Sequence, residues 1–254
     1  MALRKHEIPI LEFDDSAASV LEPTHEDLGL KLPERAVFGF LYDYVDRYAA
    51  DQGFRQAGSF VSATKTYPVW VGEFEGKPVC LMQAPVGAPA AAQILDWLLG
   101  YGVRKVIGAG SCGALTDLPE NAFLVPVRAL RDEGTSYHYA PPSRYMELDP
   151  QAARTIEAVV LSHGLPCSRV TTWSTDGFFR ETEEKVAYRR EEGCQVVEME
   201  CSALAAVAEL RGAQYGHLLY TGDSLANARH SGRNWGLDSL APALRLSLEA
   251  VCRL

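Results

Sequence analysis

The feature that most constrains this chain is an alternation of two hydrophobic patterns from residue 36 onward. Short apolar runs rich in β-branched residues predict strands, and segments with apolar residues at helical spacing predict helices. The predicted strands are 36–41, 67–73, 78–84, 105–109, 121–130, 168–173, 195–198 and 216–221. The predicted helices are 43–51, 88–99, 149–164, 181–192, 201–211 and 239–252. This alternation is typical of a single three-layer α/β domain, in which a central mixed β-sheet is flanked by helices.

Residues 1–35 stand apart from this pattern, because they contain Pro9, Pro23 and Pro33 and no sustained period. We expect them to form an N-terminal arm that wraps the body or a neighbouring subunit. The domain itself is expected over residues 36–254, since no repeat or Gly/Ser-rich linker divides that stretch. Its length suits one hydrophobic core that needs no disulfide or metal for stability.

The charge and the apolar runs exclude several classes of partner. The chain carries 24 Lys and Arg against 33 Asp and Glu, a formal charge of −9, and it has no run of basic residues. Nucleic acid is therefore not an expected partner. Apolar stretches such as 88–99 fall short of the roughly 18 residues that would cross a membrane, and no apolar leader follows the N-terminus. Six scattered cysteines indicate reduced thiols, no metal site and a cytoplasmic protein.

One glycine motif invites a cofactor interpretation that its context contradicts. Residues 108–113 fit G-x-G-x-x-G after a predicted strand, and Asp132 follows at about the distance of a ribose-binding acid. A dinucleotide site needs a helix directly after the glycines, yet Pro119 and the strand 121–130 leave no room for one. The missing helix also argues against Ser111 as a nucleophile. Two interpretations remain: a strand-end loop whose free N–H groups and hydroxyl hold an oxyanion or a sugar, or a plain tight turn.

Five segments that follow predicted strands suggest a family when they are taken together. They are Gly110-Ser111-Cys112-Gly113-Ala114, the stretch from Arg131 to Pro141 (RDEGTSYHYAP), Ser174-Thr175-Asp176-Gly177-Phe178-Phe179, Val197-Glu198-Met199-Glu200 and Gly222-Asp223. In this order and spacing the chain resembles the uridine phosphorylase and purine nucleoside phosphorylase family, over roughly residues 65 to 254. The resemblance implies a nucleoside phosphorylase-like catalytic domain. Such a domain cleaves the N-glycosidic bond of a nucleoside with phosphate, giving a free base and a pentose 1-phosphate.

The resemblance also implies roles for individual residues. Glu200 would hold the ribose hydroxyls and favour the positive charge that grows on the sugar, and Asp223 would be the general acid for the leaving base. The other implied substrate contacts are Met199 beneath the sugar, Phe178 against the base, Ser111 and Gly110 in the phosphate cradle, and Glu198 and His138 within the matching segments.

Each of these assignments has a plainer structural alternative. Glu200 can be the acid at the start of the following helix, and His138 can be a packed, hydrogen-bonded imidazole. One of Phe178 and Phe179 is expected in the core. Arg131 is expected to form a buried ion pair with a nearby acid.

The class of base stays open at this point. Asp223 matches purine-cleaving members of the family, whereas the stretch 131–141 is closest to uridine phosphorylases.

The chain departs from the family at the phosphate site. The usual Gly-Asp-Pro-x-Arg turn is replaced by residues 40–45 (FLYDYV), and the usual arginine three residues before Ser111 is Gly108. Lys65 matches an arginine that the neighbouring subunit supplies in the family, and Arg180 is the best further replacement. A dianion is costly to hold without paired charge.

This departure leaves three functions open. The first is phosphorolysis, with inorganic phosphate held by Ser111, Lys65 and Arg180 and with no other cofactor. The second is hydrolysis, as in the nucleosidases of the same superfamily, which rely on an additional glutamate that residues 36–41 do not offer. The third is a nucleoside-binding protein without catalysis. We favour phosphorolysis, and we expect a homo-oligomer built from dimers, with a hexamer among its forms.

Overall fold

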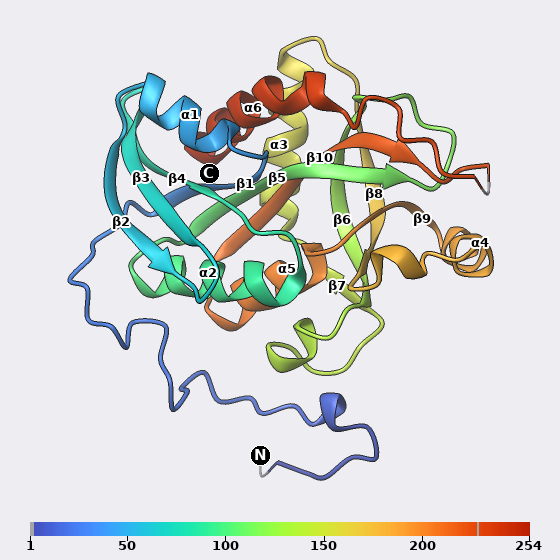
Figure 1. The fold of residues 1–254 in the computed structure, drawn as a ribbon, viewed down its shortest axis with the longest axis horizontal. Coiled ribbons are helices and arrows are strands. Elements are labelled where there is room, and N and C mark those ends of the chain that lie inside the picture. Colours follow the sequence, from blue (N-terminus) through green and yellow to red (C-terminus); the bar gives the residue numbers. More distant parts are fainter. Residues whose placement is uncertain (1–2, 228) are drawn as a thin grey trace.

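The structure is a computed structural model that describes residues 3–227 and 229–254 (Figure 1). Within these residues the strands are β1 (Arg35–Phe40), β2 (Arg55–Val61), β3 (Thr66–Phe74), β4 (Lys77–Gln83), β5 (Lys105–Ala114), β6 (Phe123–Asp132), β7 (Tyr145–Glu147), β8 (Cys167–Thr175), β9 (Cys194–Glu198) and β10 (Gln214–Ser224). The α-helices are α1 (Tyr44–Asp51), α2 (Ala88–Gly100), α3 (Pro150–Ser162), α4 (Glu183–Glu191), α5 (Cys201–Leu210) and α6 (Leu240–Arg253). Short 3₁₀ turns are η1 (Pro9–Leu11), η2 (Ser136–His138), η3 (Phe178–Arg180) and η4 (Leu237–Ser239).

All the strands belong to one mixed sheet that partly closes on itself. Its order is β10-β6-β8-β9-β5-β1-β4-β3-β2, with β7 beside β6, and β10 also pairs with β5. Strands β5, β10, β6, β8 and β9 therefore form a closed ring, from which β1, β4, β3 and β2 extend as an open wing. Strand β5 belongs to both the ring and the wing. It runs parallel to β1 and β10, and its last two residues pair antiparallel with β9.

Helices cover both faces of this sheet. Helices α1, α3 and α6 lie on one side, and α2 and α5 pack together on the other (Figure 1). Helix α2 buries Ile94, Leu95 and Leu98 against the sheet. Helix α3 begins where the sequence predicts, because Asp149 accepts a hydrogen bond from the backbone N–H of Ala152 at 2.7 Å. The expected three-layer α/β architecture with a central mixed sheet is confirmed.

The glycine-rich segment is the largest local departure from the sequence-based expectation. Residues 108–113 are not a turn but the second half of β5. Gly108 and Gly110 pair with β1 on one side and β10 on the other, and Gly113 pairs with β9. The expectation of free backbone N–H groups in a loop is therefore wrong. Close neighbours explain the glycines, since a Cβ at Gly110 would lie 3.0 Å from the Cβ of Phe40.

Two strands were missed, and four strands extend at least two residues beyond their expected ends. Strand β2 is an edge strand that is mostly exposed or half-buried, so it lacks the apolar alternation that marks a strand. Strand β7 has only three residues. Strand β10 continues to Ser224, so Asp223 lies within the strand and not after it.

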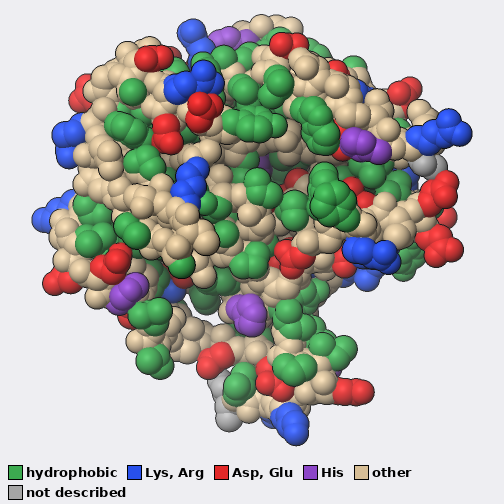
Figure 2. All heavy atoms as spheres, viewed as in Figure 1, with side chains coloured by type: hydrophobic (Ala, Val, Ile, Leu, Met, Phe, Trp, Pro, Cys, Tyr) green, Lys and Arg blue, Asp and Glu red, His purple; other side chains and the backbone are tan. Residues whose placement is uncertain are grey.

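The described residues before β1 have little regular structure. Residues 3–34 contain the 3₁₀ turn η1 and otherwise run irregularly along the body (Figure 1). Arg211 Nη1 donates to the carbonyl of Ala17, and the N–H of Leu32 donates to the carbonyl of Tyr101. Val20 and Leu21 are exposed at 111% and 68%, and the projection that the arm forms with its neighbours in Figure 2 carries hydrophobic side chains on its surface.

Two further findings bear on the composition-based expectations. All six cysteines are free thiols, and all but Cys167 are buried. In the described part of the chain, no helix has the length and apolar character needed to cross a membrane.

Candidate active site

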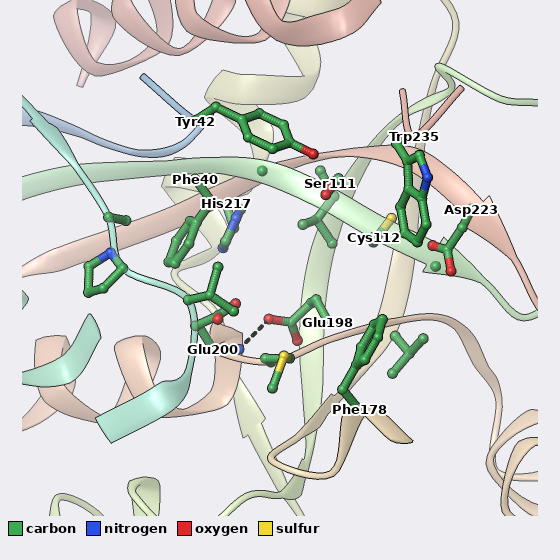
Figure 3. A pocket seen from close by; sticks show the side chains of 18 of the residues that line it. Phe40, Tyr42, Ser111, Cys112, Phe178, Glu198, Glu200, His217, Asp223 and Trp235 are labelled. Carbon is green, nitrogen blue, oxygen red and sulfur yellow. Dashed lines mark hydrogen bonds between the residues drawn. The ribbon is translucent and has the colours of Figure 1, made fainter. Parts of the chain in front are cut away.

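A cavity of about 420 Å³ opens where β1, β4, β5, β9 and β10 approach their carboxyl ends (Figure 3). This is the edge of an α/β sheet at which ligands usually bind. The cavity brings together eight of the ten site residues predicted from the sequence, and these are Lys65, Gly110, Ser111, Phe178, Glu198, Met199, Glu200 and Asp223.

The other two predicted residues lie elsewhere. Arg180 ends η3 with an exposed side chain and does not line the cavity. The predicted set of Ser111, Lys65 and Arg180 is therefore not assembled in this structure. His138 ends η2 and lines a different hollow, between η2, α2 and the N-terminal arm.

Two more expectations about neighbouring residues are wrong. Arg131 is buried, but its guanidinium donates to the hydroxyls of Ser136 and Ser143 and to backbone carbonyls, and the described residues offer it no ion pair. It braces the loop that follows β6. Neither phenylalanine of η3 is in the core, since Phe178 is 45% and Phe179 is 92% exposed.

Glu198 is held by the protein on both of its carboxylate oxygens. Oε1 accepts hydrogen bonds from the hydroxyls of Thr172 and Ser174, at 3.1 and 2.6 Å. Oε2 accepts from the backbone N–H groups of Glu200 and Cys201, at 2.7 and 2.6 Å (Figure 3). Burial raises the pKa of Glu198, and the four hydrogen bonds oppose this by stabilising the ionised carboxylate. Glu198 thus ties β8 to the start of α5 and fixes the backbone that carries Glu200.

Glu200, whose backbone Glu198 holds in place, lines the cavity. It is 6% exposed, and its Oε1 accepts a 2.5 Å hydrogen bond from the N–H of Gly87. Gly87 has φ of +102°, a backbone conformation that favours glycine. Burial, together with the negative charge of Glu198, raises the pKa of Glu200 to about 8. Hydrogen-bond donors on a ligand, such as sugar hydroxyls, would favour its charged form.

One end of the cavity combines aromatic rings with carboxyl groups. Phe178, Asp223 and Trp235 lie at this end (Figure 3), and Glu181 completes the wall. Asp223 Oδ2 lies 3.1 Å from Nε2 of His230, in the segment after β10. Burial and the nearby charge of Asp223 raise the pKa of Glu181 to about 7. This end can therefore stack a flat ring and exchange a proton with it near neutral pH.

The other end of the cavity offers hydrogen-bond donors. Phe40, Tyr42 and His217 lie there (Figure 3), with Lys65 and Tyr67 nearby in the lining. The Nζ of Lys65 donates to Gln83 Oε1 at 2.7 Å and lies 4.9 Å from the centre of the Tyr67 ring. Lys65 thus lines the cavity of its own chain, whereas the resemblance implied a contact across subunits.

The charge of the lining is strongly one-sided. Among the described residues, it holds four carboxyl groups, those of Glu181, Glu198, Glu200 and Asp223. It holds one ammonium group, that of Lys65, and no arginine. In the described chain, no cluster of His, Cys, Asp and Glu is arranged to hold a metal ion.

A family model described as the phosphorylase superfamily matches residues 34–251. The chain belongs to this superfamily. A guanosine phosphorylase of Halorubrum lacusprofundi is 23% identical over 202 residues, which are 76% of this chain and 84% of the relative. A uridine phosphorylase of Vibrio fischeri superposes with a TM-score of 0.77 at 21% identity and covers 89% of this chain and 95% of its own. An AMP nucleosidase of Bacteroides thetaiotaomicron gives 0.71 at 22% identity, with 87% and 89% covered.

Superfamily motifs in the sequence found three of the four acids of the cavity but missed Glu181 and several other lining residues. Glu181 follows directly after η3, and its position next to Phe178 and Arg180 is a signal that could have found it. Tyr42 and Trp235 come from loops whose distance to the cavity only the fold decides. His217 lies inside a buried strand, where no sequence pattern marks it as part of a site.

Proposed function

We propose that the protein is a nucleoside phosphorylase that cleaves purine nucleosides. One observation carries this proposal: a single cavity holds a buried acid, Glu200, beside Met199, and places Phe178 and Asp223 at one end. An acid for the sugar and an acid for the base are the two groups that cleavage of a purine nucleoside would use. Membership of the phosphorylase superfamily supports the same activity.

The reaction assigns one task to each group. An oxygen of phosphate attacks the anomeric carbon while the C–N bond breaks, and the bonding electrons leave with the base. Positive charge grows on the sugar, and the carboxylate of Glu200 stabilises it while accepting hydrogen bonds from the ribose hydroxyls. Asp223 donates a proton to a ring nitrogen of the leaving base, which departs as a neutral molecule. Phe178 packs against the base and holds it in line.

The acids at the base end favour a purine. A purine leaves readily when a ring nitrogen outside the glycosidic bond takes a proton, and Asp223 or Glu181 can supply it. Uracil has no basic ring nitrogen outside the glycosidic bond, so a proton donor at this end of the cavity assists its departure less. The similarity to a guanosine phosphorylase supports the same class of base.

Hydrolysis is the second candidate, and the charge of the lining favours it. One ammonium group faces four carboxyl groups among the described lining residues, a poor environment for a phosphate dianion. Water needs no such neutralisation. The superposition on an AMP nucleosidase shows that the fold is shared with a hydrolytic enzyme.

The test is release of free base from guanosine, inosine, adenosine and uridine, each with and without phosphate. Phosphate-dependent release from the purine nucleosides, with little from uridine, is the expected result. Release of equal rate without phosphate would establish hydrolysis in its place. A thermal shift by a nucleoside without any base release would indicate a binding protein.

A further inference from the structure

His217 has a ring nitrogen that the fold leaves unsatisfied. The side chain is 1% exposed and forms part of the cavity wall beside Phe40, whose ring stacks on the imidazole at 5.9 Å (Figure 3). Its Nδ1 lies 2.8 Å from the hydroxyl of Tyr215. Its Nε2 is buried and has no hydrogen-bond partner among the described residues. Buried polar atoms without partners are rare and often mark a place for a ligand or a water.

The Tyr215 contact decides which nitrogen carries the proton. Burial lowers the pKa of His217 to about 3 and raises that of Tyr215 well above its usual value, so both side chains are neutral. If Nδ1 carried the proton, the buried Tyr215 hydroxyl hydrogen would have no acceptor that the structure shows. If the hydroxyl donates to Nδ1, every hydrogen of the pair is used except the one on Nε2. Nε2 of His217 therefore carries an N–H that no described residue accepts, on a side chain that lines the cavity.

Gly108 makes room for this pair. It faces His217 in the register of the parallel strands β5 and β10. A Cβ on Gly108 would lie 2.6 Å from the Tyr215 hydroxyl and 3.0 Å from His217 Nδ1. A longer side chain at position 108, such as an arginine, is thus incompatible with the pair. His217, a neutral hydrogen-bond donor, thus occupies the space that an arginine side chain at position 108 would need.

We propose that the Nε2–H of His217 donates a hydrogen bond to a phosphate group held at the donor end of the cavity. This rests on the proposed function and names a residue for its nucleophile subsite. Ser111 and Tyr42 face the same region with their hydroxyls (Figure 3), and Lys65 contributes the one positive charge. A neutral imidazole binds an oxyanion through a directed N–H hydrogen bond and not through charge. It therefore adds a contact without the cost of burying a cation.

The phosphate group bound by His217 can come from two molecules, and the experiment distinguishes between them. Inorganic phosphate would be the attacking nucleophile with guanosine, whereas the 5′-phosphate of GMP would belong to the substrate itself. Base release is therefore measured with guanosine over a range of phosphate concentrations, and with GMP in the absence of phosphate. If His217 substitutions raise the KM for inorganic phosphate, the contact is with inorganic phosphate. If they raise the KM for GMP, the contact is with the 5′-phosphate of the substrate.

Three variants test the contact. His217→Phe with Tyr215→Phe removes both polar partners and keeps the ring volumes, so no buried hydroxyl is left unpaired. We expect about a 10-fold rise in KM for phosphate, the usual effect of losing one neutral hydrogen bond, with little change in KM for guanosine. His217→Gln keeps an N–H donor and should restore most of the phosphate affinity. His163→Asn, at the end of α3 and away from the cavity, is the matched control and should leave both constants unchanged.

A binding measurement separates this inference from the proposed function. Thermal unfolding is followed with and without inorganic phosphate, and the free-protein curves show whether each variant folds. Stabilisation of the wild type that is lost in the double variant supports the contact even before activity is found. Equal stabilisation of both proteins overturns the inference and leaves the proposed function intact. No stabilisation of the wild type, together with phosphate-independent base release, overturns both the contact and phosphorolysis.

Discussion

At the scale of single residues, the cavity separates the chemistry of the sugar from that of the base. Glu200 lies on the wall below β5 in Figure 3, while Asp223 lies at the far end with Trp235 and Phe178. The environments of the two acids differ as well. Glu200 is held by Gly87 next to the anchored Glu198, whereas Asp223 contacts His230. Each acid can therefore be tested by a substitution that removes charge and keeps shape.

Asp223→Asn and Glu200→Gln should each lower turnover at least about 100-fold, the usual scale for a general acid or a charge-stabilising group. The measurement is base release at saturating guanosine and phosphate. Asp117→Asn, an exposed acid outside the cavity, should behave as wild type. A rate near that of the wild type in either cavity variant would remove the role assigned to that acid.

Glu181 should give the reaction a pH dependence near neutrality. Its pKa is raised to about 7, so its carboxyl is largely protonated below pH 7 and becomes charged as the pH rises further. If the protonated form assists the leaving base, turnover falls as the pH rises through about 7. In Glu181→Gln this fall should disappear, because the amide does not titrate. A pH profile that is the same in both proteins would show that Glu181 does not take part.

The same raised pKa has a consequence for stability. The folded state binds the proton of Glu181 more tightly than the unfolded chain, so its contribution is full at low pH and is lost as the pH rises through about 7. Glu181→Gln should therefore raise the melting temperature at pH 8 relative to wild type, and less so at pH 5. Thermal unfolding at the two pH values measures the difference. Glu147→Gln, on the exposed side of β7, is the control.

Among the secondary-structure elements, the connection between β9 and α5 shapes the site, because it carries Met199 and Glu200. Helix α5 has no side-chain cap from its own N-cap residue, Glu200. Glu198 supplies acceptors to the first N–H groups instead, and it also binds the hydroxyls of Thr172 and Ser174 on β8. The acid that the sequence predicted as a substrate contact thus joins two strands and a helix. Two of its hydrogen bonds hold the backbone at Glu200 and Cys201.

Glu198→Ala should destabilise the fold by about 2–4 kcal/mol, because it leaves several buried donors without an acceptor. Urea unfolding measures the change. We expect Glu147→Ala, an exposed acid on β7, to stay within about 0.5 kcal/mol of wild type. A loss below about 1 kcal/mol in Glu198→Ala would contradict the role of Glu198 as an anchor of the fold.

At the scale of the whole molecule, the arm leaves apolar surface uncovered. Val20, Leu21 and Ile8 are all more than half exposed, although the arm is tied to the body at Leu32 and Ala17. A single subunit gives these side chains little to pack against. We propose that a second copy covers them and that the protein is a homo-oligomer built from dimers.

Light scattering tests this proposal directly. The chain has a mass of 27.8 kDa, so the full-length protein should show a multiple of that value. Deletion of residues 1–30 should shift the population towards the single-chain mass, while Val20→Ser with Leu21→Ser should weaken the assembly at low protein concentration. A full-length protein at the single-chain mass would contradict the proposal, and an unchanged oligomer after deletion would place the interface elsewhere.

Local sequence patterns were enough to predict the layers of the fold and most of the acids of the site. Hydrophobic period and helix caps are local, so 149–164 and 88–99 were placed correctly as helices, and the motifs around Glu200 and Asp223 marked residues that share the cavity. Strands at sheet edges escaped detection, because β2 buries too little to carry an alternating pattern.

The neighbours of each motif in space depend on contacts between distant parts of the chain. The glycines of 108–113 appeared to form a turn because the sequence does not show that β1, β10 and β9 pair with them on both sides. Arg180 follows the base-stacking segment in sequence yet does not line the cavity, while His217, far away in sequence, lies beside Gly108. Pairing between distant strands sets these neighbours, and a local pattern contains no information about a partner a hundred residues away.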